Sequence, residues 1–600
     1  MEEKKYLLFG SGYYGKLLLY FLGKNRVAGF IDNNSDKWGT YIEDIPVYSL
    51  EKILPTINNY NLILSVDPKV EEQLIEQLKK VNVFSYVTGH EVRQKIIKDR
   101  IEISGNNLLI YNKAIDWIKK HTVDNKAIIN NTGAPKAYPE VTGYFIPTLL
   151  QWGYHDLALA FAKWLCDIQK EDGSWYDTEN EAPYVFDSGQ ILKGLIAIRN
   201  IYPEVDEHIV KGCDWILSNM QNDGRLTTPT EDAWGDNGQC SELIHLYCLS
   251  PIREAAIIYN RPDYEKSVQK ILDYYKSNYL DEILDFGLLS HFYAYVLEAM
   301  LDLGEVEIVE KAMAKISLLQ KESGAVPAYK NVDWICSTGL FQFSLIWFRL
   351  GEIEKGNKAF SYACRLQNDS GGWYGSYLSE DNLEEDNNYI PYSEISWAVK
   401  FFLDALYYKN KAEFESREHT FLDEISGDNG LYKQVKEMVG RLENDSYILD
   451  AGCGKGRYLK KLIIDFPNHN YYGMDISNKV MTHINDDRIN TTQGTLTCIP
   501  YSDDSFNLVY TCEALEHAID IESAIHEMSR VTKKGGKIVV IDKNKDKLGM
   551  LEIEEWEQWF DIEYLKGIML KYCSSVEIIS NLCNFEGDST GMFCAWIGVV

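Results

Sequence analysis

Residues 446–456 read SYILDAGCGKG, and this stretch determines how the last third of the 600-residue chain is expected to fold. An apolar strand run ends at Asp450, and a glycine-rich turn then leads into a helical run. The glycines of this turn are Gly452, Gly454 and Gly456. Glycine lets the backbone approach a ligand closely, and a helix start offers free N–H groups. A second strand run ends at Asp475, where a carboxylate can accept ribose hydroxyls, so the pattern predicts a nucleotide-type site.

The alternation of strands and helices continues to the end of the chain. Residues 500–510 lead into a fourth strand, and residues 535–541 predict a fifth. Two late apolar runs predict an antiparallel end of the sheet. In this order the motifs resemble those of class I S-adenosylmethionine (SAM) methyltransferases, in the group that is similar to the ubiquinone and sugar methyltransferases. The resemblance covers residues 430–545 and implies an α/β class I methyltransferase domain over residues 415–600, with SAM as cofactor.

The resemblance assigns roles to individual positions. It places the methionine end of SAM at the glycine turn and the ribose at Asp475, with Ile476 against the adenine. Thr495 and Leu496 occupy the place where the family has Asp or Asn followed by an apolar residue, and Thr495 departs from that pattern. The implied cofactor-binding residues are Asp450, Ala451, Gly452, Gly454, Gly456, Asp475, Ile476, Thr495 and Leu496.

The methyl acceptor is expected just beyond the fourth strand. SAM carries an activated methyl group, so the protein has mainly to align an acceptor with it. An alcohol acceptor also needs a proton acceptor, and imidazole titrates in a suitable range. We therefore take His517 and Glu513 as the candidate catalytic residues, while a structural role for His517 stays open.

The middle of the chain, residues 105–410, is helical and repetitive. Helical runs end in Gln followed by a glycine turn and Trp, as in Gln169–Trp175 and Gln367–Trp373, and degenerate copies occur at Gln320–Val326 and Gln221–Gly224. The spacing of about 50 residues matches one helical hairpin, so six hairpins fit this segment. A hairpin cannot bury its apolar face alone, so neighbouring hairpins must stack. The sequence therefore predicts an all-α (α/α)6 toroid with inner helices around a central funnel.

The repeat resembles the QW motif of squalene–hopene-type cyclases and, more broadly, the toroids of prenyltransferases, six-hairpin glycosidases and polysaccharide lyases. The Gln and Trp of such motifs are structural, so we assign them to the scaffold. The resemblance stops at the architecture, because neither acidic motif of the terpene cyclases, D-x-D-D or D-D-x-x-D, occurs. A prenyltransferase-like zinc site would need Asp236, Cys240 and His291, whose spacing is not a recognised zinc pattern, so we predict no metal.

Polar and aromatic residues gather at the starts of the expected inner helices. In a toroid these starts converge at one mouth of the funnel. Carboxylates among aromatics suit hydroxyl-rich ligands there, and paired carboxylates can break or isomerise glycosidic substrates. Each acid could instead cap its own helix. The candidate funnel residues are Glu140, Asp187, Glu242, His291, Asp333 and Glu394.

The N-terminal segment carries a second glycine turn. Residues 10–15 read GSGYYG, which fits G-x-G-x-x-G between a strand and a helix, and Asp32 ends the next strand. Residues 1–98 are too short for a full dinucleotide fold. This Rossmann-like unit resembles the small N-terminal domain of bacterial sugar N-acyltransferases, which implies a nucleotide-sugar ligand, and a vestigial or packing role is the alternative. The candidate nucleotide-binding residues are Gly10, Gly12, Gly15 and Asp32.

Composition limits the partners. Asp and Glu number 90 against 60 Lys and Arg, and the net charge of −30 opposes nucleic-acid binding and docking on anionic lipid. No apolar run is long enough for a transmembrane segment, and the 12 cysteines form no CxxC pair. We therefore expect a cytoplasmic protein with reduced thiols. Nothing in the sequence specifies an oligomeric state.

Together these features predict a multidomain SAM-dependent methyltransferase that acts on a saccharide or nucleotide-sugar. Its toroid would bind or process the glycan, and the link to surface polysaccharide biosynthesis is an analogy from the combination of domains. Two alternatives stay open. The toroid could be a glycan lyase, hydrolase or epimerase in a bifunctional enzyme, or it could be only a scaffold that binds glycan or lipid.

Overall fold

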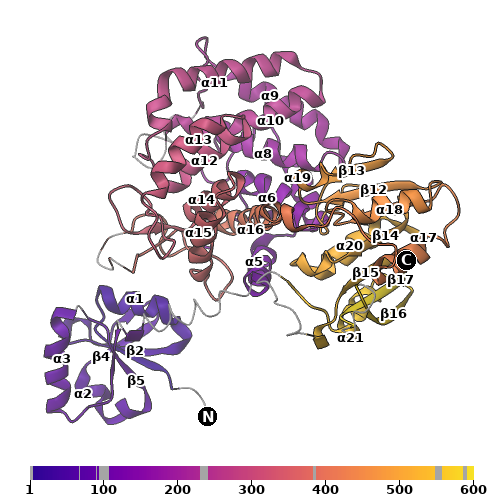
Figure 1. The fold of residues 1–600 in the computed structure, drawn as a ribbon. Coiled ribbons are helices and arrows are strands. Elements are labelled where there is room, and N and C mark those ends of the chain that lie inside the picture. The colour runs from indigo at the N-terminus through magenta and orange to yellow at the C-terminus, as the bar shows by residue number, and fades with distance from the viewer. Residues whose placement is uncertain are drawn as a thin grey trace. The chain divides into compact units, whose positions relative to one another are not determined.

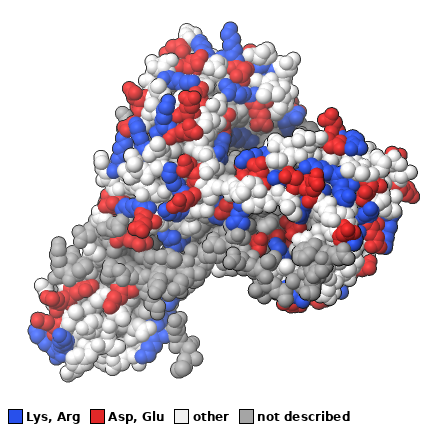
Figure 2. All heavy atoms as spheres, viewed as in Figure 1, with Lys and Arg blue, Asp and Glu red and all other residues white. Residues whose placement is uncertain are grey.

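The computed structural model describes most of the chain. The described residues are 4–66, 68–89, 91–92, 107–134, 136–229, 241–380, 382, 385, 387–547, 557–584 and 591–600. They belong to two compact units, Met1–Gly105 and Asn106–Val600, and each is described by itself (Figure 1). On the face of the second unit drawn in Figure 2, acidic and basic side chains are interspersed, so the excess of acid is spread over that face.

The first unit is a small α/β domain. Its elements are β1 (Tyr6–Phe9), α1 (Tyr13–Leu22), η1 (Lys24–Arg26), β2 (Val27–Ile31), η2 (Ser35–Lys37), β3 (Tyr41–Ile42), β4 (Ile45–Tyr48), α2 (Leu50–Ile53), η3 (Leu54–Asn59), β5 (Asn61–Leu64), α3 (Pro68–Lys80) and β6 (Val87–Thr88). The sheet order is β3-β4-β2-β1-β5-β6, and every neighbouring pair is parallel except β3 with β4. The central strands β1 and β5 are mostly apolar because apolar clusters cover both faces of the sheet.

The helical part of the second unit runs from α5 to η7. Its elements are α5 (Asn107–His121), β7 (Thr122–Val123), β8 (Ala127–Ile128), α6 (Pro139–Gln151), α7 (His155–Ile168), α8 (Val185–Ile198), η4 (Pro203–Val205), α9 (Asp206–Ser218), η6 (Glu242–Cys248), α10 (Leu249–Ile258), α11 (Pro262–Ile283), α12 (Ser290–Asp302), α13 (Val306–Ser317), β9 (Ile335–Cys336), α14 (Ser337–Arg349), α15 (Ile353–Arg365), β10 (Ser376–Tyr377), α16 (Ser396–Ser416) and η7 (Glu418–Thr420). Proline opens α6 and α11, where its missing N–H costs nothing. None of the described helices combines the length and the apolar character needed to cross a membrane.

Six inner elements of this part contact one another in a closed circuit. α6 contacts α8, α8 contacts η6, η6 contacts α12, α12 contacts α14, α14 contacts α16, and α16 contacts α6. A second helix packs on each of them: α7 on α6, α9 on α8, α11 on η6 and α10, α13 on α12, α15 on α14, and α5 on α16. The inner helix α14 is buried at every position before Arg349, as expected of a helix enclosed on all sides.

The repeated Gln–Gly turns tie successive outer helices together. Nε2 of Gln169, which follows α7, donates to the carbonyl of His208 in α9 at 3.0 Å. Nε2 of Gln367, which follows α15, donates to the carbonyl of Ile110 in α5 at 2.9 Å and so joins the last hairpin to the first. Gly371 has a φ of +98°, and a Cβ there would lie 2.0 Å from a carbonyl oxygen of α5. The recurrence of the motif along the chain therefore reflects packing between neighbouring hairpins.

The C-terminal part of the second unit is built on one sheet. Its elements are α17 (Gly430–Val439), β11 (Tyr447–Ala451), α18 (Arg457–Asp465), β12 (Asn470–Asp475), α19 (Asn478–Met481), β13 (Ile489–Gln493), β14 (Phe506–Cys512), η8 (Leu515–His517), α20 (Ile521–Val531), β15 (Thr532–Lys543), η9 (Lys545–Lys547), α21 (Ile562–Met569), β16 (Ser575–Leu582) and β17 (Phe593–Val599). The strand order is β13-β12-β11-β14-β15-β17-β16, parallel up to β15 and antiparallel beyond it. Apolar residues of α17 and α18 cover one face, and those of α20 and α21 cover the other.

A single helix joins the ring of helices to this sheet. The charged run at residues 409–418 forms the end of α16 and the start of η7. Within it, Lys409 and Glu413 are both buried and pair at 2.5 Å. The helix α16 therefore extends without interruption from the ring to the neighbourhood of the sheet.

Candidate functional site

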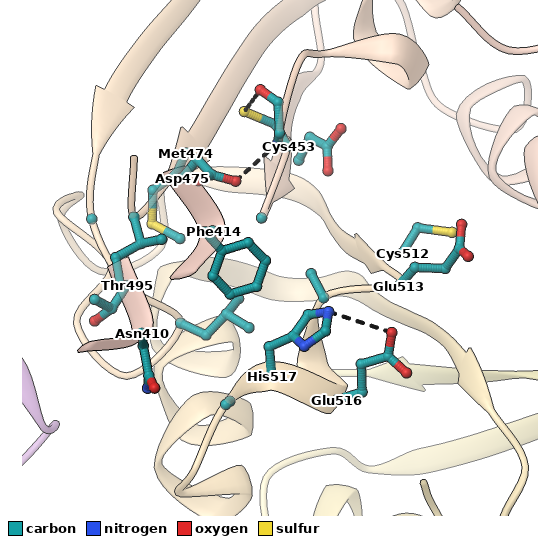
Figure 3. Close-up of a pocket in the computed structure, with 18 of the residues that line it drawn as sticks. Asn410, Phe414, Cys453, Met474, Asp475, Thr495, Cys512, Glu513, Glu516 and His517 are labelled. Atoms are coloured by element: carbon teal, nitrogen blue, oxygen red, sulfur yellow. Dashed lines mark hydrogen bonds and ion pairs between the residues drawn. The ribbon is translucent and has the colours of Figure 1, made fainter. Parts of the chain in front are cut away.

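A cavity of about 370 Å³ lies at the carboxyl ends of β11, β12 and β14. This is the edge of a parallel sheet where the loops after the strands meet and where such folds bind ligands. Its walls come from two parts of the second unit, namely these loops and the helical part (Figure 3). The helical part contributes Gln151, Trp152, Tyr407, Asn410 and Phe414.

The glycine turn between β11 and α18 forms one wall. Gly452 has a φ of +88°, and a Cβ there would lie 2.5 Å from the Cβ of Ala514, so only glycine fits. The N–H of Gly454 donates to Oδ2 of Asp475 at 2.9 Å, and the N–H of Ser477 donates to Oδ1 at 3.0 Å. Burial raises the pKa of Asp475. Backbone groups thus hold this carboxylate at the tip of β12, and each oxygen keeps a lone pair for a ligand hydroxyl.

A second buried acid, Asp450, ends β11 beside the same turn. It is 2% exposed, and it accepts a hydrogen bond from the hydroxyl of Tyr510 at 2.9 Å. Burial raises the pKa of Asp450 to about 7, and the neighbouring Asp475 carboxylate also raises it. A cation beside Asp450 would favour the charged form. The two acids at adjacent strand ends therefore suit a ligand that carries a positive charge.

Glu513 and Arg457 pair with each other in the wall of the cavity. Glu513 follows β14 with a left-handed φ of 54°, which is uncommon for a residue other than glycine. Its carboxylate forms an ion pair with the guanidinium of Arg457, the first residue of α18. Such backbone conformations persist where the surroundings hold them, and they cluster at functional sites.

His517 bounds the cavity at η8 and meets Phe414 from α16. Nε2 of His517 lies 3.5 Å from Oε1 of Glu516, and its ring meets that of Phe414 edge-on at 4.8 Å. Burial lowers the pKa of His517 to about 3, and the ammonium of Lys543 lowers it as well, so the imidazole is neutral at pH 7. If Nε2 carries the proton toward Glu516, Nδ1 is the acceptor. Nδ1 is buried and has no hydrogen-bond partner within the described part of the chain.

An acidic cluster lies behind His517. Ligand-type atoms of Glu516, His517 and Glu557 lie within 4.8 Å of one another, a spacing that a metal ion could bridge. Nζ of Lys543 lies 2.6 Å from both carboxylate oxygens of Glu516 and 3.6 Å from Oε1 of Glu557. Burial raises the pKa of Glu516 against the opposing effect of Lys543. The protein therefore supplies its own cation to these carboxylates.

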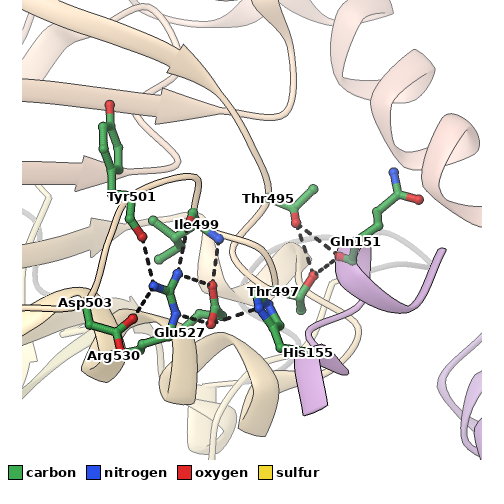
Figure 4. A network of polar contacts seen from close by, with 9 residues as sticks. All are labelled: Gln151, His155, Thr495, Thr497, Ile499, Tyr501, Asp503, Glu527 and Arg530. Carbon is green, nitrogen blue, oxygen red and sulfur yellow. Dashed lines mark hydrogen bonds and ion pairs between the residues drawn. The ribbon is translucent and has the colours of Figure 1, made fainter. Parts of the chain in front are cut away.

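The turn after α6 is fastened to the loop after β13 (Figure 4). The carbonyl of Gln151 accepts hydrogen bonds from the hydroxyls of Thr497 at 2.8 Å and Thr495 at 3.3 Å. Gly153 has a φ of +84°, and a Cβ there would lie 2.8 Å from the carbonyl oxygen of Thr497. The approach is therefore too close for any residue other than glycine.

Further contacts fix the same two segments. The hydroxyls of Tyr111 and Tyr154 lie 3.3 and 3.2 Å from Oδ2 of Asp520, the residue that caps the start of α20. Nε2 of His155 lies 3.6 Å from Oε1 of the buried Glu527 (Figure 4). The helical part is thus attached directly beside the cavity.

Most of the residues predicted for this region line the one cavity. These are Asp450, Gly452, Gly454, Asp475, Ile476, Thr495, Leu496, Glu513 and His517. Ala451 is buried in β11, and Gly456 caps α18 with a φ of 72°, so neither belongs to the lining. The sequence reasoning missed the wall from the helical part. Tyr407 and Phe414 look like ordinary apolar positions of a helix, and no local motif marks them as lining a cavity.

Two carboxyl side chains, one from α6 and one from α8, lie close together inside the ring of helices. Glu140 lies at the start of α6 and Asp187 at the start of α8, and the hydroxyl of Tyr138 lies 3.2 Å from Oδ2 of Asp187. Burial raises the pKa of Glu140, and the Asp187 carboxylate raises it further. Burial also raises the pKa of Asp187, to about 8. Two carboxyl groups thus share a buried site in which neither has an ion-pair partner within the described residues.

Aromatic rings surround this pair of carboxyl groups. The ring of Tyr295 on α12 lies 4.7 Å from that of Tyr247, 5.2 Å from that of Phe186 and 4.6 Å from that of His291. Nδ1 of His291 lies 2.7 Å from Oε1 of Gln342 on α14. Burial lowers the pKa of His291 to about 3. Side chains of several inner elements therefore converge, and the imidazole among them is neutral.

The remaining predicted funnel residues have local partners. Glu242 pairs with Arg225, whose Nε lies 2.8 Å away, and Asp333 pairs with Lys321 at 2.9 Å. Oε2 of Glu394 accepts a hydrogen bond from the indole of Trp117 at 2.7 Å. The structure therefore brings Glu140, Asp187 and His291 into one neighbourhood. Glu242, Asp333 and Glu394 instead stabilise turns. Asp236 and Cys240 of the discounted zinc alternative lie outside the described residues.

The first unit also brings its predicted residues together. Gly10 has a φ of +117°, and a Cβ on Gly15 would lie 2.0 Å from the carbonyl oxygen of Gly10. Gly12 caps the start of α1, next to these two glycines. Asp32 accepts hydrogen bonds from both the N–H and the hydroxyl of Ser11 and pairs with Lys37 at 3.1 Å. The acid therefore lies beside the glycine turn, and the protein itself occupies its carboxylate.

Comparison with known proteins identifies the C-terminal part of the chain. Residues 449–540 match a family model described as a methyltransferase domain. The chain is 30% identical over 135 residues to an uncharacterized protein of Methanocaldococcus jannaschii, covering 22% of this chain and 55% of that protein. It is 26% identical over 125 residues to the ubiquinone/menaquinone biosynthesis C-methyltransferase UbiE of Legionella pneumophila, covering 19% and 50%. A solved structure titled a possible histamine N-methyltransferase of Thermotoga maritima is 19% identical with a TM-score of 0.24, covering 31% of this chain and 94% of that one.

These matches define the class of the domain. The chain spans about half the length of the curated relatives it matches. The C-terminal part is a class I SAM-dependent methyltransferase domain with an α/β Rossmann-like fold. The matched residues include the glycine turn, Asp475 and His517, which line the cavity.

Proposed function

We propose that the protein is a SAM-dependent methyltransferase whose acceptor is a saccharide or nucleotide-sugar, in surface polysaccharide biosynthesis. The observation that carries this proposal is the cavity that the glycine turn, Asp475 and His517 line together. Asp450 and the glycine turn would hold the methionine end of SAM, and Asp475 would accept the ribose hydroxyls. Ile476, Thr495 and Leu496 would lie beside the adenine.

SAM would supply an activated methyl group, and the chain's own residues would position the acceptor and remove its proton. His517 has a pKa lowered to about 3, so it is a weak base. A hydroxyl oxygen becomes strongly acidic as its new bond to carbon forms, so a weak base suffices at that stage. In this proposal Glu516 holds the Nε2 side of the ring and Nδ1 takes the proton. Glu513 fixes the strand tip through Arg457.

We further propose that residues 105–410 form an α/α toroid that binds the saccharide. The closed circuit of contacts among the inner elements and the Gln-mediated links between outer helices support this architecture. Aromatic rings next to Glu140 and Asp187 are suited to the faces and hydroxyls of sugars. In the same proposal residues 1–98 hold a nucleotide moiety at the turn containing Gly10, Gly12 and Gly15, beside Asp32.

Two other functions compete with this proposal. The quinone-biosynthesis relative points to an isoprenoid-type acceptor, which would favour an apolar interior of the ring of helices. The carboxyl groups of Glu140 and Asp187 and the ammonium of Lys400 instead make that interior polar. The buried carboxyl pair favours a second candidate, in which the toroid also breaks or isomerises a glycosidic substrate. A toroid that only binds glycan or lipid would need no such pair.

The proposal is tested on the full chain in two steps. Calorimetry with S-adenosylhomocysteine (SAH) measures cofactor binding, and labelled methyl transfer from SAM is then measured on nucleotide-sugars, cell-envelope glycans and quinone precursors. We expect transfer to a sugar acceptor, and we expect His517→Gln to lower its rate by about 100-fold with SAH affinity nearly unchanged. Transfer only to the quinone precursor would overturn the saccharide assignment, and absence of SAH binding would overturn the methyltransferase assignment.

The same assay distinguishes a binding role from a catalytic role for the acids inside the ring of helices. If the ring only binds the acceptor, Glu140→Gln and Asp187→Asn raise the KM for the acceptor and no bond-breaking product appears. If the ring is a second catalytic site, mass spectrometry of the glycan incubated with the unaltered chain shows a cleaved or isomerised product that both variants fail to make.

A further inference from the structure

A tryptophan of the helical part lies in the wall of the methyltransferase cavity. Trp152 follows α6, is 5% exposed, and is the sole tryptophan among the described residues that line the cavity. Its ring packs against that of Tyr111 on α5, with ring centroids 4.9 Å apart. Tyr111 is in turn linked to Asp520 at the start of α20. The contact with Tyr111 therefore fixes the position of the indole.

Gln151, the residue before Trp152, is hydrogen-bonded through both its backbone carbonyl and its side chain. The carbonyl of Gln151 accepts hydrogen bonds from Thr495 and Thr497, whose hydroxyl oxygens lie 3.1 Å from each other. The side chain of Gln151 is hydrogen-bonded to the hydroxyl of Tyr407 on α16. Three hydroxyl groups thus hold one residue, and this arrangement fixes Trp152 beside the loop at residues 494–497.

That loop is the adenine side of the proposed cofactor site. The hydroxyl of Thr495 donates its hydrogen to the Gln151 carbonyl, so its donor capacity is already used in attaching the helical part. Trp152, Thr495 and Leu496 line the same cavity. An aromatic ring at this point offers a flat apolar surface of the kind on which bases pack.

We propose that Trp152 forms the wall against the adenine of SAM, so that the cofactor site is shared between the helical part and the methyltransferase domain. This inference rests on the proposed function, because it takes SAM as the cofactor. It makes Gln151 and Thr497 positioning residues for the indole. Cofactor affinity then depends on the attachment of the helical part, although the recognised SAM motifs all belong to the C-terminal domain.

The test measures binding of SAH and of adenosine to the full chain by calorimetry. Loss of an aromatic side chain that packs on a base weakens binding by roughly tenfold, so we expect this loss for Trp152→Ala with both ligands. Trp152→Phe keeps a ring and should lose about threefold or less. Trp215→Phe on α9 is the matched control, because it changes a buried tryptophan that does not line the cavity, and it should leave both affinities unchanged. Circular dichroism and melting curves establish that each variant is folded.

Fluorescence gives an independent readout of proximity. An adenine packed on Trp152 should quench part of the tryptophan emission when SAH binds, and Trp152→Phe should remove that quench while Trp215→Phe keeps it. If the unaltered chain binds SAH but Trp152→Ala binds both ligands normally, this inference is wrong and the proposed function stands. A loss for SAH without a loss for adenosine would also overturn it. If the unaltered chain binds no SAH, the proposed function fails, and this inference fails with it.

Discussion

The chain contains two glycine turns, each with an acid at the tip of the second strand, and the two acids have opposite surroundings. Asp32 in the first unit accepts hydrogen bonds from Ser11 and pairs with the ammonium of Lys37. Although burial raises its pKa, these contacts outweigh burial and the pKa of Asp32 is lowered. Asp475 receives backbone N–H groups, Gly454 among them, and burial raises its pKa. One acid is therefore neutralised by the protein, and the other is left for a ligand.

The difference shows that a glycine fingerprint specifies a fold more firmly than it specifies a binding site. Both turns have the strand–turn–helix geometry that such fingerprints require. Gly452 and Gly454 of the second turn line a cavity, and no side-chain cation within the described residues pairs with its acid, Asp475. Whether an acid can serve a ligand depends on what else the chain places beside it, which in the first unit is Lys37.

The largest expected effect is on the acid of the second turn. Asp475→Asn should weaken SAH binding by about 100-fold or more, because hydrogen bonds from ligand hydroxyls to a carboxylate are the strong, charge-assisted kind. The fold should persist, since the asparagine oxygen still accepts one backbone N–H. Calorimetry with SAH measures the loss, and Asp32→Asn serves as the control with unchanged affinity. Equal affinity in Asp475→Asn and the unaltered chain would refute the ribose contact.

The sequence predicted the motif side of this cavity, because each of those residues follows a strand at a fixed spacing. Asp450, Asp475 and His517 come from adjacent parallel strands, whose carboxyl ends must meet. The opposite wall comes from Trp152 and Phe414, which precede Asp450 by 298 and 36 residues. Their placement depends on how the ring of helices packs. No local period encodes such long-range packing, so these residues resembled ordinary core positions.

The pH dependence of cofactor binding sharpens the comparison further. Burial raises the pKa of Asp450 to about 7, so in the free protein this carboxyl becomes protonated below neutrality. The ligand amine is a cation and favours the charged carboxylate, so SAH affinity should level off above about pH 8 and fall by about tenfold between pH 8 and pH 6. Asp450→Asn should bind more weakly at pH 8 and lack this slope. A wild-type affinity that is flat from pH 8 to pH 6 would contradict the role of Asp450.

A third buried acid, Asp187 inside the ring of helices, is expected to affect the stability of the fold. Burial raises the pKa of Asp187 to about 8, so its folded form resists ionisation while the unfolded form ionises near its ordinary value. The stability contribution is therefore fully present at low pH and is lost as the pH rises toward 8. Asp187→Asn should remove this loss and raise stability at pH 8 by about 1–2 kcal/mol, since asparagine can still accept the hydrogen bond from Tyr138. Melting curves at pH 5 and pH 8 measure it, and a variant that is destabilised at pH 8 would contradict the cost of this buried acid.

The smallest expected effect is that of Asp32, whose contribution to stability depends on pH in the direction opposite to that of Asp187. Its pKa is lowered by Ser11 and Lys37 despite burial, so its contribution to stability is present above its ordinary pKa and is lost as the pH falls through the folded value. The Lys37 side chain is 40% exposed, so screening reduces the worth of the pair to about 0.5 kcal/mol or less. Asp32→Asn should lower the melting temperature of the first unit slightly at pH 7 and leave it unchanged near pH 3. If instead the variant were more stable at pH 7, Asp32 would be an uncompensated acid like Asp475, and the first unit would regain its claim to a ligand-ready site.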